Sequence, residues 1–226
     1  EGSAYFTPEE LIAYTLGKRP GCAAGEGYAY PDTRYRVLAL VIEAATGRSY
    51  YDLLTQRILV PLGLDRVRPQ DRSALPNIAM GHMGGAPALK KDGRMKLDPR
   101  TEWTGGGLVT DPEMLVRFYA ALAEGHVVGP DSLTAMIESG YRDPEQPDWH
   151  YGMGLFVSEG GNGTGNGKGA TIGHGGLWPG YRTHVMHFRA SGITVAVQTN
   201  RDGRLDLPGL VHRIADLAVS DQAGPP

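Results

Sequence analysis

The sequence contains one cysteine, Cys22, among its 226 residues. An intrachain disulfide and a metal site built from several cysteines are therefore excluded. No apolar run approaches the roughly 20 residues that a membrane-spanning helix requires. The formal net charge is −3, which gives no indication of a nucleic-acid partner. With 41% hydrophobic and 21% charged residues, the composition is typical of a folded globular protein rather than a disordered one.

Segments with helical periodicity dominate the first 150 residues. They repeat apolar residues every three or four positions, and several begin with a capping residue; they cover residues 7–18, 33–46, 49–59, 111–124 and 131–140. In the segment 33–46 we expect one buried apolar face, which consists of Tyr35, Leu38, Val41, Ile42 and Ala45. Residues 65–104 are irregular and rich in proline, glycine and charge.

The pattern changes after residue 150. Four segments are predicted to be strands: residues 151–159, 171–176, 181–189 and 192–199. The short Ala-Ser-Gly turn between the last two strands predicts that they are antiparallel neighbours. A terminal helix is predicted at 207–219, with Leu210, Val211, Ile214 and Leu217 on its apolar face. Helices followed by an antiparallel sheet and a final helix predict the α+β class, in one partial domain over residues 1–226.

Two other features give weak indications of function. His184 and His187 are three residues apart on a predicted strand, so they face opposite sides and cannot bind one metal ion together. The glycine-rich segment 160–169 lacks the spacing of a phosphate-binding loop, and we expect a flexible hairpin connection there. It contains a short glycosylation pattern, Asn162-Gly163-Thr164. We expect neither a metal nor an organic cofactor.

The segment "IGHGGLWPGYRTHV" is the first candidate for chemistry. His174 stands at a predicted strand end, and Gly175 and Gly176 follow it. Glycines there allow a substrate to lie close to the strand, where backbone N–H groups can polarise a carbonyl group. An ordinary strand end with a surface histidine explains the same residues.

The second candidate is the tripeptide Tyr30-Pro31-Asp32 at the start of the predicted helix 33–46. A tyrosine acts as a base near neutral pH only if neighbouring cations or hydrogen-bond donors stabilise its phenolate. Pro31 would make the loop rigid, and His174 or a lysine could supply the positive charge. The alternative is structural: Tyr30 packs in the loop, and Asp32 caps the helix.

Taken in order, these segments resemble the serine β-lactamase-like family. This family includes class C β-lactamases, D-Ala-D-Ala carboxypeptidases, D-aminopeptidases and β-lactamase-like esterases. The segment "GYAYPDTRYRVLALVIEAATGRSYYDLLTQRILVPLGL" is similar to the family's Tyr-x-Asn box with its helix. "TGGGLVTDPEMLVRFYAAL", "YGMGLFV" and "GHGGLWPGY" are similar to its glycine turn, its first returning strand, and its Lys-Thr-Gly or His-x-Gly box. The resemblance spans about residues 25–200 and implies a β-lactamase/transpeptidase-like fold.

The resemblance also implies roles for individual residues. Tyr30 would shuttle a proton, and His174 would tune Tyr30 and bind a polar end of the substrate. The substrate would lie along Gly175 and Gly176, and the backbone N–H of Leu177 would stabilise the oxyanion. Asp32 replaces the asparagine of the family box, and a carboxylate cannot donate a hydrogen bond as an amide does. A histidine box is commoner in the esterase and peptidase branches, so we expect hydrolysis of an ester or amide.

The family's nucleophile is the serine of Ser-x-x-Lys, which none of the serines here provides. Thr15-Leu16-Gly17-Lys18 fits only a threonine version, at a position where the family has a different helix, and we expect it to be a decoy. We therefore expect the first strands of the sheet and the nucleophile helix to lie upstream of Glu1, and the chain alone to be inactive.

Three expectations about partners follow. The substrate would be a small-molecule or peptide acyl compound. The missing segment would come from a second chain, or a homodimer would form, because the strand 192–199 is β-branched and uncharged and would have an unpaired edge. The terminal helix would cover only one face of that strand. A non-catalytic binding or structural protein that retains the fold is the alternative to an enzyme.

Overall fold

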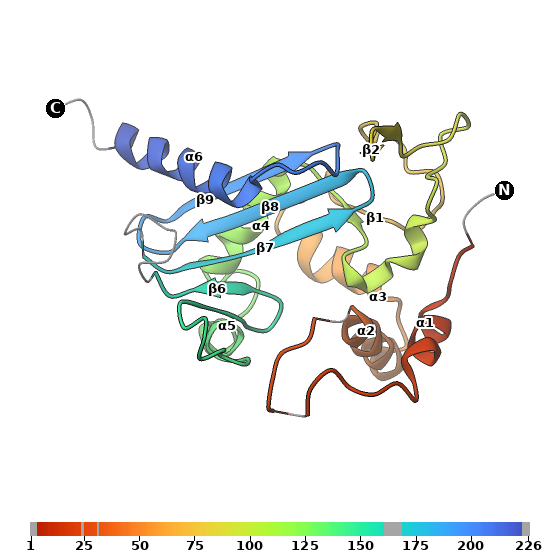
Figure 1. Ribbon diagram of the computed structural model, residues 1–226, viewed down its shortest axis with the longest axis horizontal. Helices are drawn as coiled ribbons and strands as arrows, with labels where there is room; N and C mark the ends of the chain where they lie inside the picture. Colours follow the sequence, from red (N-terminus) through yellow and green to blue (C-terminus); the bar gives the residue numbers. More distant parts are fainter. Residues whose placement is uncertain (1–3, 24, 31, 161–168, 223–226) are drawn as a thin grey trace.

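The computed structural model describes residues 4–23, 25–30, 32–160 and 169–222. Their architecture is α+β, as predicted, with helices first, an antiparallel sheet next and a long helix last (Figure 1). The helices are α1 (Pro8–Thr15), α2 (Thr33–Thr46), α3 (Tyr50–Leu54), which continues as the π-helical turn η1 (Thr55–Leu59), α4 (Pro112–Ala123), α5 (Pro130–Glu138) and α6 (Leu207–Gln222). The Asn162-Gly163-Thr164 pattern lies outside the described residues.

Five antiparallel strands form the main sheet, in the order β5-β6-β7-β8-β9. Their bounds are β5 (Trp149–Tyr151), β6 (Phe156–Ser158), β7 (Thr171–Trp178), β8 (Tyr181–Phe188) and β9 (Ile193–Thr199). The predicted pairing of the last two strands is confirmed, with Arg182 opposite Thr199 and Phe188 opposite Ile193.

The prediction of one strand at 151–159 is wrong. The segment contributes the end of β5 and all of β6, which pair with each other as a hairpin. Gly154 has a φ of +76°, which ends the extended conformation between them. At Gly152, a Cβ atom would meet the carbonyl oxygen of Met136 at 2.1 Å. The two glycines therefore make the tight turn that a continuous strand would not allow.

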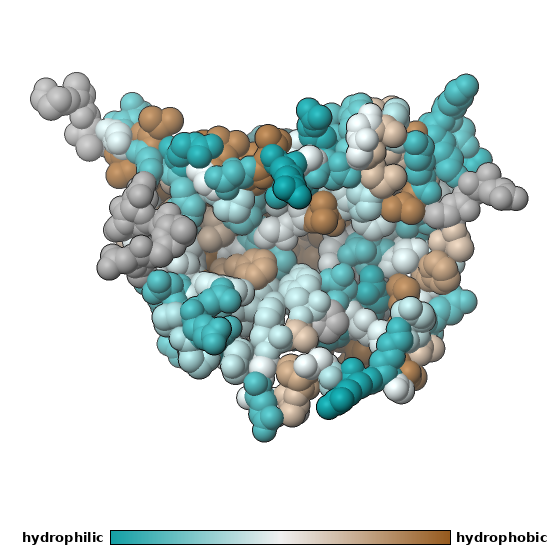
Figure 2. All heavy atoms as spheres, in the orientation of Figure 1, coloured by the Kyte–Doolittle hydropathy of each residue, from teal (hydrophilic) through white to brown (hydrophobic). Residues whose placement is uncertain are grey.

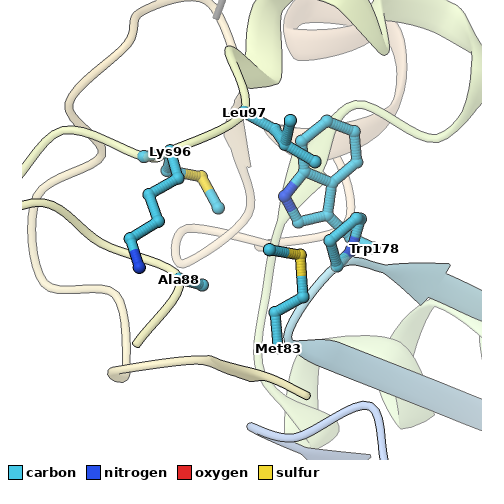
Figure 3. Close-up of a pocket in the computed structure, with 7 residues that line it drawn as sticks. Met83, Ala88, Lys96, Leu97 and Trp178 are labelled. Carbon is cyan, nitrogen blue, oxygen red and sulfur yellow. The ribbon is translucent and has the colours of Figure 1, made fainter. Parts of the chain in front are cut away.

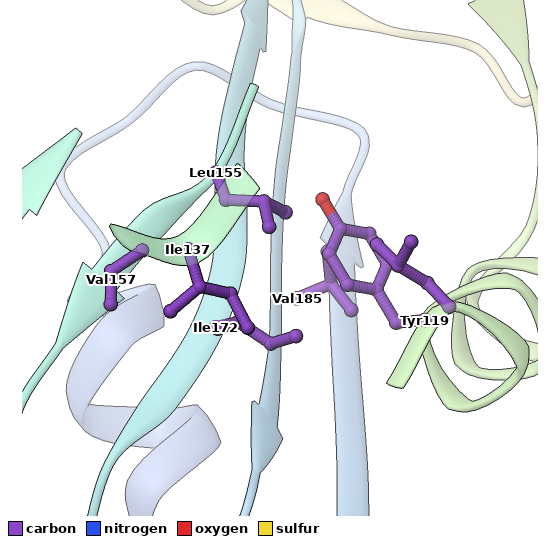
Figure 4. Close-up of a cluster of buried hydrophobic side chains, with 7 residues drawn as sticks. Tyr119, Ile137, Leu155, Val157, Ile172 and Val185 are labelled. Atoms are coloured by element: carbon purple, nitrogen blue, oxygen red, sulfur yellow. The ribbon is translucent and has the colours of Figure 1, made fainter. Parts of the chain in front are cut away.

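Helices cover both faces of the sheet: the terminal helix covers only one face of the strand 192–199, as expected, and α4 covers the other. On one face, Tyr119 and Leu122 of α4 pack with Val157, Ile172 and Val185 of the sheet (Figure 4). On the other face, Val211 and Ala215 of α6 pack with Met186, Phe188 and Val195. The two layers hold β7, β8 and β9 rigidly between them.

Helices α6 and α2 bury faces other than those predicted from the sequence. In α6 the buried residues are Leu207, Val211 and Ala215, while Ile214 and Leu217 are exposed. Figure 2 shows hydrophobic surface where α6 lies in Figure 1. The small side chain of Ala215 lets α6 lie close to the sheet. In α2 the buried residues are Arg36 and Ala39.

The predicted apolar face of α2 is largely exposed: Leu38 and Val41 have exposed fractions of 56% and 59%. Arg36 instead turns inward, where its NH2 group lies 3.8 Å from a carboxylate oxygen of Glu102. Of the predicted apolar face, Tyr35 is partly buried, with its hydroxyl oxygen 2.7 Å from that of Tyr151, and the other four residues are exposed.

The segment 65–104 is mostly irregular, as predicted. Its short elements are the strands β1 (Arg68–Pro69), β2 (His82–Met83) and β3 (Ala86–Pro87) and the 3-10 turns η2 (Pro99–Thr101) and η3 (Trp103–Gly105). Strand β1 pairs with β4 (Leu108–Val109). This segment is fastened to the β7–β8 turn. The hydroxyl group of Tyr181 donates to the carbonyl of Ala79 at 2.7 Å and accepts from the N–H of Gly81 at 3.0 Å.

A small cavity of about 10 Å³ marks the same junction. The indole of Trp178, at the end of β7, lies among Met83, Ala88 and Leu97 of the irregular segment (Figure 3). The end of β7 is therefore held by a part of the chain that is remote in sequence. Among the described residues, no helix is both long and apolar enough to cross a membrane.

We expect the chain to associate with itself or with another polypeptide. Strand β9 is an outer strand of the sheet, and nothing in the described residues pairs along its far edge. Six of the seven residues in "ITVAVQT" are β-branched or apolar, and such an edge favours pairing with another strand. Sedimentation velocity should show a species heavier than 24.3 kDa, and intact mass should show whether a second polypeptide is present. A monomer at every concentration would contradict this prediction.

Candidate active site

A large cleft of about 980 Å³ opens between the helices and the sheet. All six residues that the sequence predicted for a site line this cleft: Tyr30, Asp32, His174, Gly175, Gly176 and Leu177. Pro31 lies outside the described residues. The fold thus brings together two segments that are 144 residues apart.

Tyr30 and His174 face each other across the cleft. The Tyr30 hydroxyl oxygen lies 3.5 Å from Nε2 of His174, at the limit of a hydrogen bond. Partial burial raises the pKa of Tyr30, while the nearby hydroxyl group of Tyr151 acts in the opposite direction. Tyr30 is therefore a neutral phenol near pH 7, able to donate its proton to an acceptor.

His174 is such an acceptor, and its hydrogen bonds define its tautomer. Nδ1 lies 2.5 Å from the carbonyl oxygen of Gly175. Because a carbonyl oxygen only accepts, Nδ1 carries the proton, and Nε2 of the neutral ring has a free electron pair. Burial lowers the pKa of His174. The expectation that His174 supplies a positive charge to Tyr30 is therefore wrong at neutral pH.

Tyr151 also lines the cleft, although no role was predicted for it from the sequence. Its hydroxyl oxygen lies 3.0 Å from Nε2 of His174 and 2.7 Å from the hydroxyl oxygen of Tyr35. Its ring meets the ring of Tyr30 edge to face, with centroids 5.3 Å apart. Tyr151 stands in "YGMGLFV", where it follows an ordinary strand pattern, so only the tertiary fold reveals its contact with His174.

The prediction that Asp32 caps α2 through its side chain is wrong. The residue occupies the N-cap position but has helical backbone angles, φ −60° and ψ −22°, and its carboxylate makes no capping hydrogen bond. A capping side chain normally needs an extended backbone at this position. The carboxylate of Asp32 is instead one of the polar groups of the cleft.

Glu102 is a second carboxylate in the cleft that the sequence did not reveal. Its burial and the nearby charge of Asp32 raise its pKa, and Arg36 opposes this effect. At Gly105, a Cβ atom would lie 2.8 Å from Oε1 of Glu102 and 3.3 Å from Cβ of Asp32, so glycine leaves room for both acids. Arg36 lies 3.8 Å from Glu102, and with one arginine for two carboxylates the region is negative when both acids are ionised.

Strand β7 offers an unpaired edge to the cleft. Strand β6 pairs only with Thr171, Ile172 and Gly173 of β7, so the part from His174 onward has no described neighbour on that side. Leu177 is 72% exposed there. An extended acyl chain could therefore lie along this edge and hydrogen-bond to backbone groups.

The cleft has no serine among its described lining residues. The threonine decoy lies elsewhere: the hydroxyl group of Thr15 donates to the carbonyl of Ile12 within α1, and Nζ of Lys18 lies 3.2 Å from the ring centre of Tyr14. Among the described residues, no group of three or more His, Cys, Asp or Glu side chains could hold a metal ion.

Mild acid is expected to destabilise the protein. Burial lowers the pKa values of His174, His184 and His187 in the folded state, whereas an unfolded histidine titrates near ~6.5. Just below that pH the unfolded chain binds more protons than the folded chain, so the free energy of unfolding falls as the pH falls. Denaturant titrations at several pH values between about 7.5 and 5 should show this slope. His184→Gln should reduce this slope, and a flat profile would contradict the prediction.

Comparison with known proteins agrees with this architecture. The family model described as Beta-lactamase matches residues 1–219. A D-aminopeptidase of Gluconobacter oxydans is 25% identical over 178 residues, which are 78% of this chain and 32% of that protein. A penicillin-binding protein of Bacillus subtilis is 26% identical over 189 residues, 78% of this chain and 40% of that protein. The chain thus spans about a third of the length of these relatives.

Solved structures show the same similarity. A D-stereospecific amidohydrolase from Streptomyces sp. superposes with a TM-score of 0.75 and 27% identity, over 88% of this chain and 57% of that one. The D-amino acid amidase from Ochrobactrum anthropi SV3 superposes with a TM-score of 0.76 and 21% identity, over 97% of this chain and 67% of that one. The α+β fold is therefore of the β-lactamase/transpeptidase-like type.

Proposed function

The chain belongs to the β-lactamase family, whose model matches residues 1–219, and on this premise we propose that it forms part of a serine hydrolase that cleaves an amide or ester through a covalent acyl-enzyme. The observation that carries the proposal is the meeting of Tyr30 and His174 in one cleft, with their reactive atoms 3.5 Å apart. These residues stand at the positions of the family's tyrosine and histidine boxes.

The nucleophilic serine comes from a segment outside these 226 residues. The cleft supports this proposal, because its volume of about 980 Å³ lies at the top of the range for small-molecule pockets, ~300–1,000 Å³. Its wall opposite the sheet is apolar and includes Leu54, Ile58, Met114 and Phe118. An apolar segment that carries Ser-x-x-Lys would pack against this wall and bring its serine toward Tyr30. A second chain or a dimer could supply the segment.

The reaction would proceed in two balanced steps. The serine oxygen attacks the acyl carbon, the bond to the leaving group breaks, and the serine proton passes through the lysine and Tyr30 to the leaving nitrogen or oxygen. Water then attacks the acyl carbon, the ester bond to the serine breaks, a proton of the water returns to the serine oxygen, and the acyl group leaves as a carboxylic acid. The neutral His174 accepts a hydrogen bond from Tyr30, which makes the Tyr30 oxygen a better proton carrier. The N–H groups of Leu177 and of the serine would hold the developing oxyanion.

The two carboxylates beside Tyr30 favour substrates with a positive charge. Arg36 pairs with Glu102 at 3.8 Å, and burial, with the nearby charge of Asp32, raises the pKa of Glu102. A substrate ammonium group between the two carboxylates would relieve their repulsion. The relatives are named D-aminopeptidases and a D-amino acid amidase, and a free amino group next to the scissile amide would match this charge.

Asp32→Asn tests the preference. In an active protein completed by the serine segment, we expect KM for an amino acid amide to rise about tenfold, the ~1.4 kcal/mol typical of one charge-assisted hydrogen bond. The kinetics with an uncharged ester should stay within about twofold, because that substrate has no ammonium group. An equal loss with both substrates would contradict the preference. Arg34→Gln, outside the cleft lining, is the matched control for a change of one charge.

The proposed function is tested by the reading frame upstream of Glu1 together with intact mass. If this frame encodes Ser-x-x-Lys, the extended protein should gain the mass of one acyl or phosphonyl group when treated with an activated ester or a fluorophosphonate. Serine to alanine in that motif should abolish the adduct, and the 226-residue chain serves as the control. A frame without the motif, in a protein that purifies without any second polypeptide, would favour the non-catalytic binding or structural alternative.

A further inference from the structure

We propose that Tyr151 is a positioning residue of this site: its hydroxyl group, supported by Tyr35, holds the imidazole of His174 with Nε2 facing Tyr30. The consequence for catalysis rests on the proposed function, but the hydrogen-bonded arrangement itself does not. Nothing in the sequence motif of either tyrosine indicates this role.

The arrangement is a chain of three side chains from three elements. Tyr35 of α2 reaches Tyr151 of β5 at 2.7 Å between hydroxyl oxygens, and Tyr151 reaches His174 of β7 at 3.0 Å. On the far side of the ring, Nδ1 donates to the Gly175 carbonyl. The hydroxyl group of Tyr151 must therefore be the donor to Nε2, and Tyr35 can donate to the oxygen of Tyr151. Every polar atom in the chain from Tyr35 to Gly175 then has a partner.

In addition to the hydrogen bonds, aromatic contacts hold the rings of these residues in place. The ring of Phe156 lies 4.8 Å from the imidazole of His174, and the ring of Tyr151 stands at 81° to it. Tyr151 also stands at 90° to Tyr30. The imidazole is thus held between aromatic side chains, and its Nε2 can point only toward the two phenols.

Two phenols share one electron pair on Nε2, because an imidazole nitrogen has a single in-plane acceptor site. In this structure Tyr151 occupies the acceptor site, with its hydroxyl oxygen 3.0 Å from Nε2. The hydroxyl oxygen of Tyr30 lies 3.5 Å from the same nitrogen. When Tyr30 approaches, the Tyr151 hydroxyl still has Tyr35 as its partner. This matters because Tyr151 is only 5% exposed, and a buried hydroxyl without a partner is costly. Tyr35 therefore lets Tyr151 release His174 without that penalty.

The first test needs no catalysis. The 226-residue chain is labelled with ¹⁵N, and the imidazole nitrogens are observed at neutral pH, with His174 assigned from His174→Gln. We expect an unprotonated Nε2 that accepts a hydrogen bond. Tyr151→Phe and Tyr35→Phe are made in a Tyr30→Phe background, because Tyr30 could otherwise take over the acceptor site on Nε2. Relative to Tyr30→Phe alone, Tyr151→Phe should move the Nε2 resonance toward that of a nitrogen without a hydrogen bond, and Tyr35→Phe should cause a smaller shift in the same direction. A protonated Nε2 in the unmodified chain, or an unchanged resonance when Tyr151→Phe is added to Tyr30→Phe, would overturn the proposal.

Tyr28→Phe is the matched control. Tyr28 packs against Tyr151 with ring centroids 5.5 Å apart, but its buried hydroxyl has no hydrogen-bond partner among the described residues. Removing that hydroxyl should leave the His174 resonance unchanged. Near-ultraviolet circular dichroism of each variant checks that the aromatic cluster still folds, so a shift from misfolding is recognised.

The second test measures kinetics in the protein completed by the serine segment. Tyr151→Phe should lower kcat roughly tenfold with little change in KM, less than the 10²–10⁴-fold typical of a residue that itself transfers the proton. An undiminished kcat would overturn the catalytic part of the proposal. An unmodified protein without any hydrolytic activity would contradict the proposed function instead, and the ¹⁵N measurement would still decide the role of Tyr151.

Discussion

The 226-residue chain by itself is expected to hydrolyse a nitrophenyl acyl ester no faster than buffer does. The sequence has no Ser-x-x-Lys, and no serine is among the described residues that line the cleft. Loss of the nucleophile typically removes most of a ~10⁶-fold or greater acceleration. Tyr30 and His174, which we propose to act in proton transfer, would form no acyl-enzyme by themselves. Continuous absorbance assays with at least equimolar enzyme would detect even a single turnover.

The control is the chain extended by its Ser-x-x-Lys segment, which should restore both a burst and turnover. One result would overturn the prediction: a stoichiometric burst from the 226-residue chain that Thr15→Ala abolishes. That outcome would show that Thr15 and Lys18 form the nucleophilic pair after rearrangement of α1, where the Thr15 hydroxyl now bonds to Ile12.

Tyr30→Phe is expected to lower kcat by 10²–10⁴-fold in the completed protein, since it removes the phenol that would transfer the proton. The ring and its edge-to-face contact with Tyr151 remain, so substrate affinity should change little. The loss should be the same for charged and uncharged substrates. Steady-state kinetics with an ester and an amide would measure it.

Two variants make the Tyr30 result specific. Tyr28→Phe removes a neighbouring hydroxyl that has no hydrogen-bond partner in the described part of the chain, and it should be nearly silent. Asp32→Asn should cost far less than Tyr30→Phe with an uncharged ester. Equal and large losses for Tyr30→Phe and Asp32→Asn would identify Asp32 as a catalytic group.

Local signals in the sequence were enough to locate helix α2 and the strands β8 and β9. Helix α2 was predicted at 33–46 and occupies Thr33–Thr46, because Gly47 adopts the left-handed conformation that ends a helix, with a φ of +66°. The strands of the β8–β9 hairpin were recognised from their β-branched residues and short turn. Such features depend on neighbours in sequence, so a single chain reveals them.

The orientation of the elements could not be predicted in the same way. The periodicity of α2 showed where its apolar residues lie, but the ion pair between Arg36 and Glu102 rotates another face inward. Glu102 and Tyr151 were missed for a related reason. The Tyr35–Tyr151 hydrogen bond joins residues 116 positions apart, and no local pattern encodes such a contact. The site residues that were found are those with a family motif around them.

The contacts that fasten the irregular segment 65–104 to the β7–β8 turn separate two properties of the cleft. These are the shape of its rim and the identity of the residues proposed to transfer protons. Trp178 and Tyr181 line the cleft. Tyr181 is held in place by Ala79 and Gly81, which are far in sequence from both Tyr30 and His174. At Gly81 any Cβ atom would meet the Tyr181 ring at 2.4 Å, so even a single added methyl group there must displace the rim. Natural selection or laboratory evolution can therefore alter which substrates enter by varying residues 79–97, while Tyr30 and His174, the residues proposed to carry the chemistry, are inherited unchanged.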